Sequence, residues 1–262
     1  MKTLLIPFDF SKASENALKY SVEFAMHEKP ILKIYLLHLI DEHTNEDDAY
    51  KKLKSIINEY DKPEYPNPKI EPLVKRGRLT TLALALRQEL QIDLVIVGTR
   101  GTEVFRKDMT SNTSKFIREV DMPVLVIPEK SQGFNLRNIV LTTGEEKIPD
   151  RNVLFTLLEI ARRFNAKVNL LTIGRDKKMM GDSEYDEFNE KTIEYFLEMF
   201  YSHHTFIANE DIVEGINQYL EKQHIDMLAI MPKTHLAKDK ASQGKLTNIL
   251  TIYSEKPLLI LD

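Results

Sequence analysis

The stretch Gln91-Ile92-Asp93-Leu94-Val95-Ile96-Val97 decides the fold, because the chain uses nearly the same pattern a second time. It returns about 130 residues later, an ordinary domain length, as His224-Ile225-Asp226-Met227-Leu228-Ala229-Ile230. In both copies Ile-Asp ends a polar segment and opens an apolar run. Met122-Pro123-Val124-Leu125-Val126-Ile127 is repeated in the same way as Lys256-Pro257-Leu258-Leu259-Ile260-Leu261. Self-similarity at a fixed period indicates a duplicated structural unit.

We therefore predict two tandem domains, over residues 1–130 and 137–262. The polar segment Glu129–Arg137 is the predicted linker between them, since it interrupts the pattern and contains Gly133.

Within each copy, short apolar runs alternate with longer amphipathic segments. The predicted strands are Thr3–Pro7, Leu32–Ile40, Lys69–Val74, Asp93–Val97, Pro123–Ile127, Asn138–Thr142, Lys167–Ile173, Thr205–Ala208, Asp226–Met231 and Pro257–Leu261. The predicted helices are Ser11–His27, Asp47–Tyr60, Thr80–Glu89, Ser111–Glu119, Pro149–Phe164, Glu184–Tyr201, Asp211–Gln223 and Leu246–Tyr253. Such alternation predicts an α/β protein: two Rossmann-like domains, each a five-stranded parallel sheet with helices on both faces.

The composition excludes several classes of function. The chain has 262 residues, a formal net charge of -4 and no cysteine. A mildly acidic protein is not a general nucleic-acid binder, and without thiols it holds neither disulfides nor thiolate metal sites. Its apolar runs fall short of the roughly 20 residues that span a bilayer. We expect a soluble cytoplasmic protein that contacts no membrane.

A candidate phosphate-binding loop follows the strand predicted over Asp93–Val97. Gly98-Thr99-Arg100-Gly101 comes directly after its apolar run, and Ser111-Asn112-Thr113-Ser114 begins a helix nine residues later. Glycines let backbone N–H groups approach a phosphate, and a helix start adds free N–H donors, hydroxyls and the positive end of the dipole. The plainer interpretations are a tight turn and ordinary helix capping.

With four further motifs, this spacing resembles that of the universal stress protein family, whose phosphate motif is Gly-x-x-Gly, nine residues, then Gly-Ser/Thr. The further motifs are Ile6-Pro7-Phe8-Asp9-Phe10-Ser11, Leu37-His38-Leu39-Ile40-Asp41, Val74-Lys75-Arg76-Gly77 and Pro123-Val124-Leu125-Val126. The resemblance covers the N-terminal half closely and the second half in layout, so it implies a tandem member of the family.

The resemblance implies that the N-terminal domain binds ATP, or AMP or ADP, with or without Mg²⁺. Asp9 and Leu39 would contact the nucleoside. The phosphates would be lined by Gly98, Gly101, Ser111, Asn112, Thr113 and Ser114. Ser111 departs from the family, which has glycine there, and its Cβ limits how closely the backbone approaches.

The second copy departs further from the family pattern. Gly144 stands at the position of Asp9, and Met231 and Thr234 stand at the positions of the two loop glycines. We therefore expect the second domain to bind no nucleotide.

The chain carries no recognisable catalytic motif, so we expect no catalytic residues, no metal site, no tightly bound redox cofactor and at most weak ATP hydrolysis. The nucleotide would act as a regulatory ligand in a stress response. The alternative is a nucleotide-independent interaction module with an unknown protein partner. A nucleotidyl-transfer enzyme would need a phosphate motif where Pro7-Phe8-Asp9-Phe10 stands. The resemblance also implies that Pro123–Ile127 and Pro257–Leu261 pair within one chain as a pseudo-dimer, which leaves a further homodimer open.

Four other features have plain structural interpretations. Asp9 suits a helix cap, and His38 suits packing at a strand end. His203-His204 is predicted to be a solvated pair rather than a metal site, because neighbours on a strand point to opposite faces. An aromatic-rich helical face is predicted to be core, or in part to pack between the two domains, rather than to bind a cofactor; it comprises Tyr185, Phe188, Phe196, Met199 and Phe200.

Overall fold

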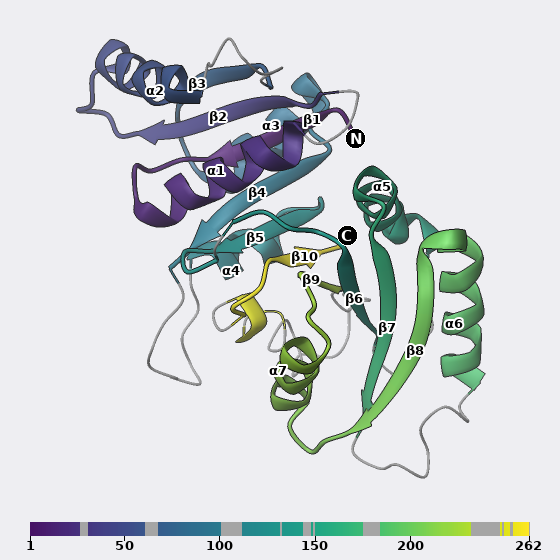
Figure 1. Cartoon of the computed structure of the whole chain (residues 1–262). Coiled ribbons are helices and arrows are strands. Elements are labelled where there is room, and N and C mark those ends of the chain that lie inside the picture. The colour runs from purple at the N-terminus through teal and green to yellow at the C-terminus, as the bar shows by residue number, and fades with distance from the viewer. Residues whose placement is uncertain are drawn as a thin grey trace. The chain divides into compact units, whose positions relative to one another are not determined.

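The computed structural model of the chain divides into two compact units, Met1–Phe134 and Asn135–Asp262 (Figure 1). The residues that it describes are 1–26, 31–60, 68–100, 112–131, 133–143, 148, 150–174, 184–231, 247, 249–251 and 254–261.

The N-terminal unit is one parallel sheet with the strand order β3-β2-β1-β4-β5. Its elements are β1 (Thr3–Pro7), α1 (Lys12–Met26), β2 (Lys33–Ile40), α2 (Glu46–Tyr60), β3 (Ile70–Arg76), α3 (Leu79–Leu90), β4 (Leu94–Thr99), α4 (Asn112–Glu119) and β5 (Val124–Pro128). Right-handed crossovers place α1 and α2 on one face of the sheet and α3 and α4 on the other (Figure 1).

The second unit repeats this topology, with the parallel order β10-β9-β6-β7-β8. Its elements are β6 (Asn138–Thr143), the short 3₁₀ helix η1 (Arg151–Leu154), α5 (Phe155–Phe164), β7 (Lys167–Gly174), α6 (Glu184–Leu197), the 3₁₀ turn η3 (Glu198–Phe200), β8 (Tyr201–Ala208), α7 (Ile212–Lys222), β9 (Met227–Ile230) and β10 (Leu258–Ile260). The predicted fold class is confirmed. Each strand of the first unit has a counterpart in the second, as duplication requires.

The central strands are continuous apolar runs because both faces of the sheet are covered. Leu4, Leu5 and Ile6 of β1 are fully buried, as are Leu94, Val95 and Ile96 of β4. Burial on this scale stabilises each side chain by about 1.5–3 kcal/mol relative to full exposure. These runs therefore form the core of the N-terminal unit and hold the carboxyl ends of its strands in place.

The repeated Ile-Asp pair has a structural role that the structure makes clear in the first unit. Ile92 is buried, while the carboxylate of Asp93 accepts hydrogen bonds at Oδ2 from the backbone N–H groups of Lys2 (2.5 Å) and Thr3 (2.9 Å). The aspartate before β4 therefore clamps the start of β1, about 90 residues away along the chain.

The same clamp recurs in the second unit. Asp226 Oδ2 accepts from the N–H groups of Arg137 (2.8 Å) and Asn138 (2.9 Å), and Oδ1 accepts from Asn135 Nδ2 (2.9 Å). The motif that revealed the repeat is thus a hydrogen-bonding device that each unit needs at the amino end of its first strand.

Two predicted boundaries in the second unit are wrong. The helix predicted over Glu184–Tyr201 ends at Leu197, because Glu198 adopts a left-handed backbone conformation with a φ of 49° and the chain turns. The strand predicted from Thr205 begins at Tyr201 instead. Pairing with β7, through a register irregularity, outweighs the local pattern.

The predicted helix over Pro149–Phe164 opens as η1, which Asp150 caps by accepting from Asn152 N, and continues as α5. Half of the helix predicted over Leu246–Tyr253 lies outside the described residues, namely 246, 248, 252 and 253.

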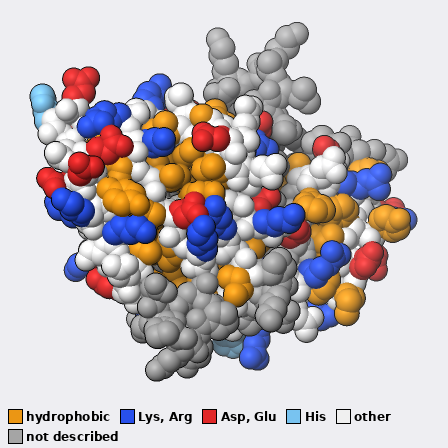
Figure 2. All heavy atoms as spheres, turned by 90° about the horizontal axis from the view of Figure 1, so that it is seen from above, with side chains coloured by type: hydrophobic (Ala, Val, Ile, Leu, Met, Phe, Trp, Pro, Cys, Tyr) orange, Lys and Arg blue, Asp and Glu red, His pale blue; other side chains and the backbone are white. Residues whose placement is uncertain are grey.

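Apolar side chains reach the surface in several places between charged ones on the face drawn in Figure 2. Among the helices that the structure describes, none combines the length and the apolar character that a membrane crossing requires.

Candidate functional site

The carboxyl edge of the N-terminal sheet contains the point where the strand order reverses. The chain lays down β1, β2 and β3 in one direction and then returns to place β4 on the other side of β1. Ligands of open α/β sheets bind in the crevice outside this switch point. Asp9 follows β1, Gly98 belongs to the end of β4 and Leu39 to the end of β2, so three predicted site residues come from strands around this point.

Asp9 lies in a tight network with the first turn of α1. Its Oδ1 accepts from Ser11 N (3.1 Å) and Ser11 Oγ (2.5 Å), while Asp9 N donates to Ser14 Oγ (3.3 Å). Ser11 Oγ in turn accepts from Ser14 N (3.3 Å), so Ser11 caps the helix and Asp9 orients that cap. The prediction that Asp9 itself caps α1 is therefore wrong, because Ser11 is the cap and Asp9 accepts hydrogen bonds from Ser11.

The environment of Asp9 keeps it ionised. Partial burial alone would raise its pKa, but hydrogen bonds from Ser11 and Ser14, together with the charge of Arg100, outweigh burial and hold the pKa below its ordinary value. The site therefore presents a carboxylate, which only accepts hydrogen bonds, at neutral pH.

The aromatic residues that flank Asp9 in the sequence pack against each other and against His38. Phe10 adopts a left-handed conformation with a φ of 60°, and its ring lies edge-on to Phe8 (centroids 5.1 Å apart) and to His38 (4.7 Å). His38 Nδ1 lies 2.8 Å from the carbonyl oxygen of Phe8 and carries the proton, because a carbonyl oxygen only accepts. His38 is thus held by packing and by this hydrogen bond, as expected.

Gly98 is required by packing, which the sequence interpretation missed. A Cβ at this position would lie 2.1 Å from the carbonyl oxygen of Ala13 and 3.0 Å from Ser14 N. The first turn of α1 passes so closely over β4 that only glycine fits. The glycine therefore needs no phosphate to explain it.

The predicted phosphate-binding segment is described only in part. Asn112 is the first residue of α4 and is exposed, Thr113 is half-buried, and Ser114 is almost fully buried. Two exposed or half-exposed polar residues thus stand at the positive end of a helix dipole. Gly101 and Ser111 lie outside the described residues.

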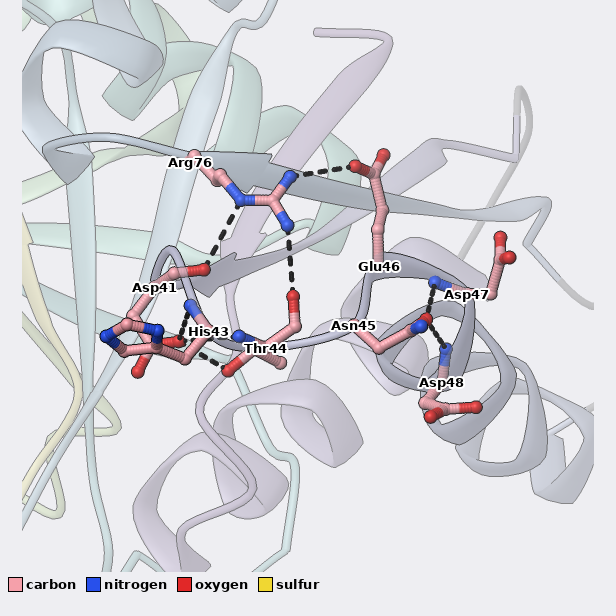
Figure 3. Close-up of polar contacts among 8 residues, drawn as sticks. All are labelled: Asp41, His43, Thr44, Asn45, Glu46, Asp47, Asp48 and Arg76. Atoms are coloured by element: carbon pink, nitrogen blue, oxygen red, sulfur yellow. Dashed lines mark hydrogen bonds and ion pairs between the residues drawn. The ribbon is translucent and has the colours of Figure 1, made fainter.

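Arg76, at the end of β3, holds the loop that follows β2 beside this edge (Figure 3). Its guanidinium donates from Nε to the carbonyl of Asp41 (3.3 Å), from Nη2 to the carbonyl of Thr44 (3.0 Å) and from Nη1 to Glu46 Oε2 (3.1 Å). Hydrogen bonds from Thr44 lower the pKa of Asp41; the bond from the hydroxyl has the larger effect and the bond from the backbone N–H the next largest. The motif Val74-Lys75-Arg76-Gly77 is the sequence feature from which these contacts of Arg76 with the loop after β2 could have been found.

The N-terminal unit is similar to proteins of a known family. Residues 1–128 match the model of the Universal stress protein family. This match covers most of the N-terminal unit, which is therefore a universal stress protein domain. Universal stress protein G of Escherichia coli O157:H7 is 24% identical over 146 residues, which cover 48% of this chain and 98% of that protein.

Solved structures extend the likeness in fold to the whole chain. A universal stress protein from Archaeoglobus fulgidus DSM 4304 aligns with a TM-score of 0.74 at 15% identity, over 99% of this chain and 98% of that one. The cytoplasmic domain of a prokaryotic cation chloride cotransporter aligns with a TM-score of 0.58 at 12% identity, over 100% and 95%. Proteins with different roles share this architecture, so likeness at this level shows the fold alone.

The second unit holds a partly buried polar chain that links β7, β8 and α6 through His204. His204 Nε2 lies 2.9 Å from Thr172 Oγ1, and Nδ1 lies 3.2 Å from Glu190 Oε2. Its side chain is only 3% exposed, so the predicted solvated pair is wrong for His204, although His203 is exposed. The register irregularity in β8 and the cover of α6 bury it.

No cluster of three metal-binding side chains occurs among the described residues. Met231 directly follows β9, whereas Gly144 and Thr234 lie outside the described part of the chain.

Proposed function

We propose that the N-terminal unit binds ATP, or ADP or AMP, at the carboxyl edge between β1 and β4, and that the nucleotide is a regulatory ligand in a cytoplasmic stress response. The observation that carries the proposal is the ionised carboxylate of Asp9, oriented by Ser11 and Ser14 at the switch point of a universal stress protein domain. A fixed carboxylate suits the hydroxyl and amino donors of a nucleoside.

In this proposal the first residues of α4 bind the phosphates of the nucleotide. Asn112 and Thr113 offer N–H and side-chain donors at a helix start, where the dipole favours an anion. The ligand would regulate by binding one conformation of the domain better than another, since equal affinity for both shifts no equilibrium.

Calorimetric titration of the full chain tests the proposal, with ATP, ADP and AMP in turn, each with and without Mg²⁺. Asp9→Asn keeps one oxygen that can accept from Ser11, removes the charge and replaces the other accepting oxygen with a donating NH2 group. Loss of a charge-assisted hydrogen bond of about 1.5–3 kcal/mol predicts affinity that is ten- to a hundredfold weaker. Asn112→Ala combined with Thr113→Val is expected to weaken ATP more than AMP.

Asp121→Asn is the matched control. Its side chain is 91% exposed beside Arg87, before β5 and hence at the opposite edge of the sheet. Affinity equal to that of the wild type is expected. If the wild-type chain shows no heat with any of the three nucleotides at millimolar concentration, the proposal is wrong.

A nucleotide-independent interaction module is the second candidate, and one observation favours it. The packing of α1 against β4 explains Gly98 fully, so this glycine no longer points to phosphate. Gly98→Val would disturb that packing and cannot separate the two functions, whereas Asp9→Asn can.

A further inference from the structure

The outer face of α6 is apolar where a solvent-facing helix is ordinarily polar. The inner face buries Asn189, Ile193 and Leu197. On the other side Phe188 is 45% exposed and Tyr195 76%, and Met199 in the following turn is 68% exposed. The prediction that Phe188 and Met199 belong to the core is therefore wrong, and Tyr185 lies outside the residues whose burial is described.

We call this surface the seam: it consists of the exposed side chains of Phe188, Tyr195 and Met199, with the half-buried Thr192 between Phe188 and Tyr195. Phe188, Thr192 and Tyr195 are spaced i, i+4 and i+7, which places them on one stripe. Side chains at i and i+7 lie one above the other on one face, which is the spacing at which apolar side chains pack against a second helix. Large apolar groups gathered on one exposed face mark interaction sites.

The duplication supplies an internal control for this seam. Helix α2 makes the same connection in the first unit and buries Ala49, Leu53 and Ile57 at the same spacing as the buried residues of α6. Matching the buried positions places Asp48, Lys52, Ser55 and Glu59 where α6 has Phe188, Thr192, Tyr195 and Met199, and all four are exposed. The fold therefore does not require an apolar seam at this position.

The charges beside the seam indicate the partner. Glu187, Glu194 and Glu198 are exposed and each precedes a seam residue by one position, while Lys191 pairs with Glu187 (2.5 Å). The border of the seam is therefore net acidic. Two copies of α6 would bring these carboxylates together, whereas a basic helix would neutralise them.

We propose that the outer face of α6 docks an amphipathic helix of a partner protein whose apolar stripe is bordered by lysine or arginine side chains. The recognition is of the helix-in-groove kind, in which apolar anchors supply affinity and flanking charges set orientation. The proposal is independent of nucleotide binding in the first unit, since every residue that carries it belongs to the second.

Fluorescence anisotropy with a labelled synthetic helix of about 20 residues, leucines on one stripe and lysines beside it, tests this surface on the full chain. We expect saturable binding that weakens with salt. Tyr195→Ser combined with Met199→Glu installs the residues of α2 and is expected to weaken binding at least about tenfold, as loss of a central aromatic anchor does. Glu194→Lys is expected to weaken the basic probe and strengthen one with glutamates in place of lysines.

Phe155→Ser is the matched control, because Phe155 is 54% exposed on α5 of the same unit. It is expected to bind like the wild type, and circular dichroism should show every variant folded. The proposal is overturned if the basic probe does not bind saturably, if the double variant binds it unchanged, or if the acidic probe binds the wild type equally. A wild-type dimer that the double variant converts to a monomer would assign the face to a second copy and overturn it as well.

Discussion

Replacing Gly98 by alanine adds one methyl group where the backbone of α1 passes closest to β4. The new Cβ would lie 2.1 Å from the Ala13 carbonyl oxygen, about 1.4 Å inside an ordinary contact of about 3.5 Å. Because the obstructing atoms belong to the backbone of α1, no side-chain rotation relieves the clash. The helix must therefore move away from β4, which loosens the turn that holds Asp9.

The expected cost follows from this geometry. Overpacking a well-packed interior costs about 1–3 kcal/mol, occasionally more, and the backbone obstruction places Gly98→Ala at the upper end. The lower chain entropy of alanine returns about 0.5–1 kcal/mol. We expect a loss of about 2 kcal/mol or more from the N-terminal unit, with a melting temperature about 10 °C lower.

Urea unfolding followed by circular dichroism measures this loss. Gly215→Ala is the comparison, since its Cβ would lie 3.1 Å from the movable Ile173 Cδ1 and 3.2 Å from Asn209 Cβ, contacts that are far milder than 2.1 Å from a backbone oxygen. Alanine also gains about 1 kcal/mol of helix propensity in α7, so this variant should stay within about 1 kcal/mol of the wild type. Wild-type stability of Gly98→Ala, within about 0.5 kcal/mol, would refute the packing argument.

Two further predictions concern the second unit. Asp226→Ala removes the acceptor of three hydrogen bonds, and a loss of about 2 kcal/mol is expected in urea unfolding, with Asp226→Asn milder because it keeps one acceptor oxygen. The hydroxyl of Tyr201 donates to Glu190 Oε1 (2.8 Å). Burial is the largest cause that raises the pKa of Tyr201, and the hydrogen bond to the carboxylate of Glu190 raises this pKa further. A raised folded-state pKa means that this stabilisation is present below the ordinary tyrosine pKa of about 10 and is lost as the pH rises through the higher value. Tyr201→Phe should therefore flatten the alkaline side of the stability profile, and an unchanged profile would contradict this reasoning.

The sequence by itself determined the elements and their repetition. The apolar run Thr3–Pro7 is β1 residue for residue, because a strand covered on both faces needs apolar groups throughout. The Ile-Asp repeat correctly revealed two units, and the parallel sheet with helices on both faces follows from strand–helix alternation and crossover handedness, which are local and chiral rules. Most of the strands and helices that were predicted appear within a few residues of their expected ends.

The candidate site could be predicted only in part. The structure places Asp9 after β1 at the carboxyl edge of the sheet, as the motif predicted, whereas its role in binding stays a prediction. That the carboxylate of Asp9 orients the Ser11 cap, and that Arg76 holds the loop after β2, depend on side-chain geometry that residue types do not specify.

Features that depend on packing between residues far apart in the sequence were decided only by the tertiary structure. Gly98 is a glycine because Ala13 passes over it, a contact between residues far apart in the sequence. His204 is buried because β8 begins earlier than its polar sequence predicts, and Phe188 and Met199 are exposed although their aromatic-rich helix face predicted core. The physical reason is the same in each case: periodicity shows that a residue is apolar or polar, but which surface covers it depends on elements that the local pattern does not contain.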